Sequence, residues 1–181
     1  MTRRFDPETS FCQEPPSLGN TYLGDRVLRS YLARVLPAGV LEEIEGELKQ
    51  MGELAGGDLY RQQLAELRDE PRLIPWDPWG RRIDEIRVTL LWRRAEDLAA
   101  HRGVVATAYE RRNGHFSRIH QMALAYLFSP STDVYGCPLA MTDGAARTLE
   151  LSGNRRLLSR AFGHLVSRDP AHFWTSGQWM T

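Results

Sequence analysis

The sequence predicts a mainly helical fold for this chain of 181 residues. Apolar residues recur every three or four positions over most of the chain, and Gly and Pro interrupt them at helix-sized intervals. Hardly any segment alternates as a β-strand does. A chain of this length can bury a core without a disulfide framework or a structural metal. The expected architecture is a bundle of about six or seven helices.

The composition excludes several classes of protein. The 23 basic residues balance 23 acidic ones, so no overall field attracts nucleic acid or an anionic membrane. Cys12 and Cys137 are too few for a disulfide scaffold, and we expect two buried, reduced thiols. The chain shows neither a secretory signal nor an apolar run near the length of about 20 residues that crosses a bilayer. We therefore expect a cytoplasmic protein.

The first half of the chain divides into an arm and helices. Residues 1–24 contain Pro and Gly without any period, which predicts an extended arm, and a helical domain follows over residues 25–170. Asp25 is expected to cap a helix that ends before Pro37. A second amphipathic helix covers residues 41–51, and Gly56-Gly57 is expected to break it.

The segment from Pro71 to Gly80 differs in composition from the helices around it. Asp77-Pro78-Trp79-Gly80 has the residues of a tight turn, and residues 83–88 are a short candidate strand. Trp76 and Trp79 are expected to clamp this loop against a helix, in preference to stacking on a ligand.

One long apolar stripe follows, over residues 88–109, and predicts a helix interrupted only at Arg102. Asn113-Gly114 ends it, and residues 116–127 form the next helix, antiparallel to the first. His120 falls on the apolar face of this helix. A buried, hydrogen-bonded histidine is the favoured interpretation, because no carboxylate or nucleophile accompanies it in the sequence.

The last third contains two further helices and a change of pattern. A helix is expected over residues 136–153, with Pro138 in its first turn, and Asn154 is expected to cap the next one. Residues 171–181 then read as an extended entry into a β-strand.

Common catalytic motifs are absent from the sequence. We find no phosphate-binding loop, no GxGxxG, GxSxG or HExxH, and no CxxC. Cys137 stands at a helix start, where the helix dipole can activate a thiol, but no His or second Cys is assigned to it. Motifs alone leave a helical domain without an assigned activity.

Three stretches in order carry a resemblance to a known family: PSLGNTYLGDRVL (16–28), WDPWGRRIDEIRV (76–88) and CPLAMTDGAARTLE (137–150). They resemble the acyl-CoA dehydrogenase superfamily, in its AidB-like branch, which is associated with the response to DNA alkylation. The final HFWTSGQWMT resembles the start of the family's flavin-contacting strand. The resemblance implies an N-terminal helical domain, a middle β-barrel and a C-terminal bundle, of which this chain holds the first and the beginning of the second.

A flavin cofactor is the main functional implication of the resemblance. It implies an FAD-dependent oxidoreductase acting on CH–CH groups. Gln178, Met180 and Thr181 match the strand that hydrogen-bonds the isoalloxazine edge, where fixed donors stabilise the reduced flavin. The family's catalytic carboxylate lies beyond this sequence, so no catalytic residue is named. We expect weak or no FAD binding by this chain alone.

The resemblance also implies a substrate and partners. Gly136, Cys137, Pro138 and Met141 match a helix that lines the acyl pocket, so an acyl-CoA-like molecule is the expected ligand. Family members are homotetramers, and their DNA-binding residues lie in a later part of the chain, so we expect no nucleic-acid contact here. The alternative is a non-catalytic helical module, derived from this family, that serves assembly.

Overall fold

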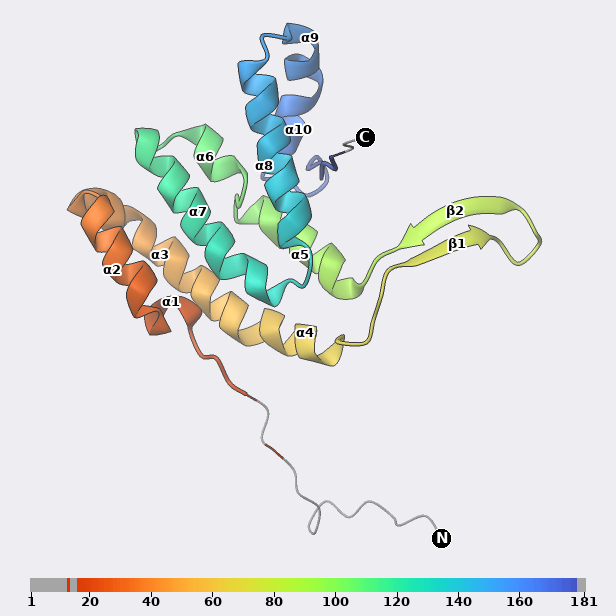
Figure 1. Cartoon of the computed structure of the whole chain (residues 1–181), viewed down its shortest axis with the longest axis horizontal. Coiled ribbons are helices and arrows are strands. Elements are labelled where there is room, and N and C mark those ends of the chain that lie inside the picture. The colour runs from red at the N-terminus through yellow and green to blue at the C-terminus, as the bar shows by residue number, and fades with distance from the viewer. Residues whose placement is uncertain (1–12, 14–15, 179–181) are drawn as a thin grey trace.

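The computed structural model describes residues 13 and 16–178. The prediction of a mainly helical fold is confirmed (Figure 1). The elements, in chain order, are α1 (Thr21–Gly24), α2 (Arg26–Val35), α3 (Ala38–Leu54), η1 (Ala55–Leu59), α4 (Tyr60–Ala65), β1 (Arg72–Trp76), β2 (Arg82–Arg87), α5 (Leu90–His101), α6 (Ala106–Glu110), η2 (Gly114–Phe116), α7 (Ser117–Phe128), η3 (Ser129–Ser131), α8 (Gly136–Leu151), α9 (Arg155–Leu157), η4 (Leu158–Phe162) and α10 (Gly163–Leu165).

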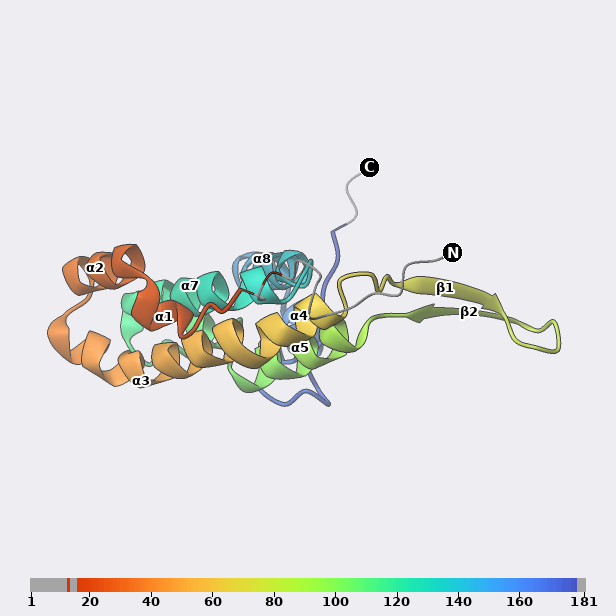
Figure 2. The ribbon, with the colours of Figure 1, turned by 90° about the horizontal axis from the view of Figure 1, so that it is seen from below.

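The helices form two layers. Figure 2 shows α2, α7 and α8 on one side and α3, α4 and α5 on the other. The core lies between them and includes Ile44, Leu48 and Met51 of α3, Leu91 of α5, and Leu124 and Phe128 of α7. Because both layers contribute apolar faces to this core, the amphipathic patterns of the sequence are satisfied within the chain.

Side-chain caps fix the first helices. Asn20 accepts hydrogen bonds from the amides of Tyr22 and Leu23, both at 3.1 Å, and so begins α1. The arm that the sequence predicts therefore contains one helical turn near its end. Asp25 accepts from the amide of Leu28 at 2.8 Å, which confirms the predicted cap of α2.

The predicted break at Gly56-Gly57 is wrong, because α3, η1 and α4 follow one another without a gap from residue 38 to 65. These glycines make room for a neighbour instead. A Cβ on Gly56 would lie 1.8 Å from the carbonyl oxygen of Gly19, and one on Gly52 would lie 2.3 Å from Oδ1 of Asn20. The N-terminal segment thus lies directly on the helix backbone.

The single helix predicted over residues 88–109 is also divided. α5 ends at His101, and Gly103 adopts a left-handed φ of 62° before α6 begins. A Cβ on Gly103 would lie 2.4 Å from Cζ of Arg168, whose Nε donates to Glu110 at 2.5 Å. The turn thus brings the last part of the described chain against α6.

The strands form an antiparallel hairpin that extends away from the helices (Figures 1 and 2). The candidate strand at residues 83–88 is confirmed with a shift of one residue. The clamp expected of the tryptophans is wrong, since Trp76 is 55% and Trp79 88% exposed. Asp77 Oδ1 accepts from the amides of Trp79 and Arg81, at 2.9 and 2.8 Å, and this tight turn carries Trp79 away from the helices.

The last third follows the sequence prediction as far as residue 170. α8 begins at Gly136, and Asn154 caps α9 by accepting from the amide of Leu157 at 3.1 Å. Residues 173–178 have neither helix nor strand assigned, so the entry into a barrel remains a prediction. Within the described part of the chain, no helix combines the length and apolar character that a bilayer crossing requires.

Candidate functional site

Of the three predicted flavin-contacting residues, Gln178 is described, whereas Met180 and Thr181 lie outside the described residues. Gln178 is exposed and lies beside α8. Its Nε2 is 3.5 Å from the position that a Cβ on Gly144 would take, which is ordinary van der Waals contact. The end of the described chain therefore passes over α8, the helix predicted to line the acyl pocket.

The segment before Gln178 is held at several points. The ring of Trp174 stacks on His164, with centroids 4.1 Å apart and an interplanar angle of 6°. The amide of Ser176 donates to Oγ1 of Thr142 in α8 at 2.9 Å. These contacts fix the direction in which the chain leaves the helical body.

A hydrogen-bonded chain of side chains adds to this anchor. Thr175 Oγ1 donates to Glu96 Oε1 at 3.0 Å, and the hydroxyl of Tyr135 lies 3.1 Å from the same Thr175 oxygen. Since the Thr175 proton points to Glu96, Tyr135 is the donor to Thr175. Burial raises the pKa of Tyr135, so this phenol stays protonated.

The four predicted acyl-pocket residues lie at the start of α8 and differ in their exposure. Gly136 packs on Ser129, because a Cβ there would lie 2.7 Å from Ser129 Oγ, and it lines a groove described below. Pro138 is buried and Met141 is half-buried, and neither lines that groove. Cys137 is exposed, so the expected burial of this thiol is wrong, because the first turn of α8 presents this position to solvent. Cys12, the other thiol expected to be buried, lies outside the described residues.

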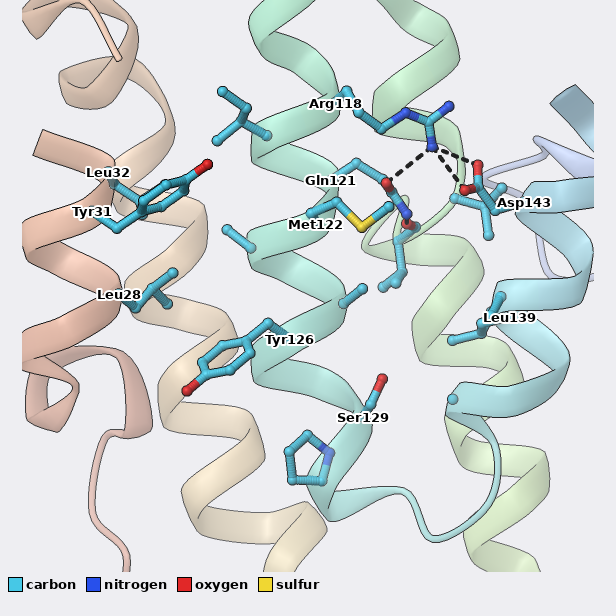
Figure 3. Close-up of a pocket in the computed structure, with 18 residues that line it drawn as sticks. Leu28, Tyr31, Leu32, Arg118, Gln121, Met122, Tyr126, Ser129, Leu139 and Asp143 are labelled. Carbon is cyan, nitrogen blue, oxygen red and sulfur yellow. Dashed lines mark hydrogen bonds and ion pairs between the residues drawn. The ribbon is translucent and has the colours of Figure 1, made fainter. Parts of the chain in front are cut away.

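An open groove of about 730 Å³ runs along α7 (Figure 3). Its walls come from α2 and α8, and most of its lining is apolar. The residues that line it include Leu28 and Tyr31 of α2, Met122 and Tyr126 of α7, and Leu139 and Ala140 of α8. Sequence reasoning missed this groove, since it depends on how far apart three helices pack.

One end of the groove is polar. Arg118 Nη1 donates to both carboxylate oxygens of Asp143, at 2.7 and 2.8 Å, and to Gln121 Oε1 at 3.2 Å (Figure 3). The hydroxyl of Tyr109 lies 2.7 Å from Asp143 Oδ1, and Gln121 donates to the carbonyl of Val104 at 3.0 Å. Burial raises the pKa of Tyr109 to about 12, so it acts as a donor.

His120 occupies a separate, small cavity of about 60 Å³. It is buried as predicted, but its Nε2 makes no hydrogen bond within the described structure, although Glu47 Oε2 is 3.2 Å away. Burial lowers the pKa of His120, and the carboxylate of Glu47 opposes that shift. Among the described residues, no three His, Cys, Asp or Glu side chains are grouped so as to hold a metal ion.

Comparison with known protein families identifies the family of this chain. The family model for the N-terminal domain of the adaptive response protein AidB matches residues 13–169. The chain belongs to the AidB N-terminal domain family. This domain is part of the acyl-CoA dehydrogenase family, so the resemblance noted in the sequence is confirmed. Acyl-CoA dehydrogenases are FAD flavoproteins.

Individual relatives of this AidB-type domain agree with that assignment. Acyl-CoA dehydrogenase family member 11 of Caenorhabditis elegans is 40% identical over 176 residues, which are 94% of this chain and 28% of that protein. The solved structure of Bd2924 in its apo form is 48% identical with a TM-score of 0.89, over 95% of this chain and 34% of that one. The structure of C. elegans ACDH-11 in complex with C11-CoA is 37% identical with a TM-score of 0.87, over 98% and 31%.

The AidB-type domain thus spans about a third of the length of these relatives. Over this length the chain shares its fold and its family with these relatives. The predicted flavin contacts of Gln178, Met180 and Thr181 remain predictions, as do the acyl contacts expected at the start of α8.

Proposed function

We propose that this chain forms the N-terminal helical part of an FAD-dependent oxidoreductase that acts on the CH–CH bond of an acyl-CoA. The proposal rests on membership of the acyl-CoA dehydrogenase family and on a relative, ACDH-11, whose structure contains C11-CoA. Bound FAD would supply the hydride acceptor of such a reaction. The complete protein would be a cytoplasmic homotetramer that makes no DNA contact through this domain.

The observation that carries the proposal is the anchored segment before Gln178. The backbone amide of Ser176 ties it to Thr142 of α8, and the side chain of Thr175 ties it to Glu96 of α5. Within the described structure the amides of Gly177 and Gln178 have no hydrogen-bond partner, and such donors suit the acceptor edge of an isoalloxazine ring. Donors fixed in this way need no reorganisation when a reduced flavin gains electron density.

The proposed acyl contact lies on α8, next to the same segment. Met141 is half-buried, and Gly136, Cys137 and Pro138 precede it on the first turn. The family's general base is not among these residues. The role that we assign to this domain is therefore to bind and orient, while proton abstraction belongs to a carboxylate elsewhere in the oxidoreductase.

Flavin content tests this proposal. The 181-residue chain and the polypeptide encoded by the complete reading frame that contains it would be purified in parallel and compared by absorbance. We expect stoichiometric FAD in the second and little or none in the first. If the longer polypeptide were colourless and failed to take up added FAD, the proposal would be contradicted. Stoichiometric FAD in the 181-residue chain would instead show that this chain alone contains the FAD site.

A non-catalytic assembly module is the second candidate, and the hairpin favours it. Trp76, Trp79 and Ile86 are all more than half exposed on an element that does not pack on the helices. Aromatic residues exposed in this way are common at protein interfaces. Sedimentation of the 181-residue chain tests this candidate: an assembly module predicts an oligomer that Trp79→Ser dissociates, and a monomeric wild-type chain would contradict it.

A further inference from the structure

A second pocket adjoins the apolar groove at its polar end. It has a volume of about 250 Å³ and lies between α6, the turn that follows it, and α8. Arg111, His115 and Arg147 line it around Glu150, and Arg118 lines both this pocket and the groove. The two hollows therefore lie on either side of the Arg118 side chain.

The charges of this arginine pocket do not cancel. Glu150 accepts from both Arg111 and Arg147, so two guanidinium groups share one carboxylate. Arg118 is paired with Asp143. Three arginines against two carboxylates leave an excess of one positive charge. Such a pocket favours an anion.

The backbone at Arg111 gives a second indication that its side chain has a role. Arg111 has φ 52° and ψ 33°, the left-handed conformation that ends α6. Gly or Asn is favoured at such a position, because a larger side chain strains the backbone. An arginine here is disfavoured by the local fold, and its guanidinium is directed to the pocket by Glu150.

Arg118 offers N–H donors at the junction between the groove and the arginine pocket. Asp143 already accepts from Arg118 and lies within hydrogen-bond distance of the Tyr109 hydroxyl. Asp143 and Gln121 are bonded through Nη1 of Arg118 and not through its Nε or Nη2, and the side chain is 37% exposed. A ligand at this end thus meets N–H groups, which bind carboxylate or phosphate oxygens.

The groove beyond this junction suits an unbranched apolar chain. From Arg118 to Ser129, which directly follows α7, the groove extends over 11 residue steps, or about 16 Å at the helical rise. Leu28, Met122 and Leu139 provide apolar surface along it. Its volume lies within the range typical of small-molecule sites.

We propose that the groove and the arginine pocket together bind an amphipathic anion, with one long acyl chain along α7 and a phosphate or carboxylate head at Arg111, Arg118 and Arg147. This site does not rest on the proposed function. Of the four residues predicted to line the acyl-CoA pocket, Gly136 also lines the groove, whereas Cys137, Pro138 and Met141 do not.

Calorimetric titration of the 181-residue chain tests the site. The probes are 1-palmitoyl lysophosphatidate, palmitate, hexadecanol and inorganic phosphate, all below their aggregation limits. We expect both charged amphiphiles to bind, hexadecanol to bind about tenfold more weakly for want of the charged head, and phosphate alone to bind at least about 100-fold more weakly. The preferred charged probe identifies the head group. Equal affinity for hexadecanol, or no binding of either charged amphiphile, would overturn the proposal.

Variants separate the head and chain contacts. Arg111→Gly relieves the left-handed backbone and removes one head contact, so it should keep the thermal stability and lose about tenfold in affinity for the charged probes. Met122→Asp places a charge in the half-exposed groove and should abolish binding. Arg156→Gln and Leu151→Asp change exposed residues outside both hollows and should bind as wild type.

Unchanged affinity in Arg111→Gly and Met122→Asp would contradict the site. So would a groove occupied by a second copy of the chain. In that case sedimentation would show a dimer that Met122→Asp dissociates, and no charged amphiphile would bind.

Discussion

Gly52 and Gly56 let the N-terminal segment lie on the backbone of α3 and η1. Gly57 is next in the chain, yet a Cβ there would meet nothing within 4 Å. From the sequence the two neighbouring glycines look alike, and both suggest a helix break. Their different surroundings arise from the contact with Gly19, which is distant in sequence.

Alanine substitutions should separate these two glycines. Gly56→Ala forces Cβ against the carbonyl of Gly19, so we expect the free energy of unfolding to fall by about 3 kcal/mol. Gly57→Ala is the matched control, and higher helix propensity should raise the stability by about 0.5 to 1 kcal/mol. Urea denaturation measures both. Equal effects of the two substitutions would show that the close approach of Gly19 is not maintained in solution.

His120 should make stability depend on pH. Burial lowers its pKa in the folded state despite Glu47 and Glu43, while Arg168 and Arg112 act in the same direction as burial. The unfolded chain therefore binds a proton more readily, and stability is lost as pH falls through about 6.5, the ordinary value for histidine. Relative to wild type, His120→Gln should lose less stability between pH 8 and pH 5. Parallel curves for the two proteins would contradict a buried neutral imidazole.

At the scale of elements, local signals in the sequence were reliable where one residue acts on its own backbone. Asp25 and Asn154 cap helices as predicted, because a short polar side chain reaches the nearest free amides. The break at Gly103 was missed, since the apolar stripe continues across it. The groove and the Arg118–Asp143 pair were missed because they join residues of different helices, which no spacing within one helix reveals.

The hairpin allows a prediction about element stability. Trp79 is 88% exposed at its turn, so Trp79→Ala should change the free energy of unfolding by less than about 0.5 kcal/mol. Trp92 is half-buried in α5, with its ring 5.1 Å from that of Tyr135, and Trp92→Ala should cost about 3 kcal/mol. A comparable loss in both variants would mean that the hairpin folds back on the helices.

At the scale of the whole molecule, the chain is a helical domain whose relatives are about three times longer. Its family could be recognised from three short stretches of sequence, because they include the turn of the hairpin and the start of α8. The structure does not test the predicted flavin contacts of Met180 and Thr181, since both lie outside the described residues. What the structure adds is the anchored direction of the segment that leads to them.

Anaerobic titration with C11-CoA tests the central proposal most directly. The polypeptide of the complete reading frame, loaded with FAD, would be titrated while flavin absorbance is recorded. An FAD-dependent oxidoreductase acting on the CH–CH bond of an acyl-CoA predicts that the oxidised flavin band disappears with about one equivalent of ligand. Flavin that remains oxidised in the presence of excess C11-CoA and of acyl-CoAs with shorter and longer chains would contradict it.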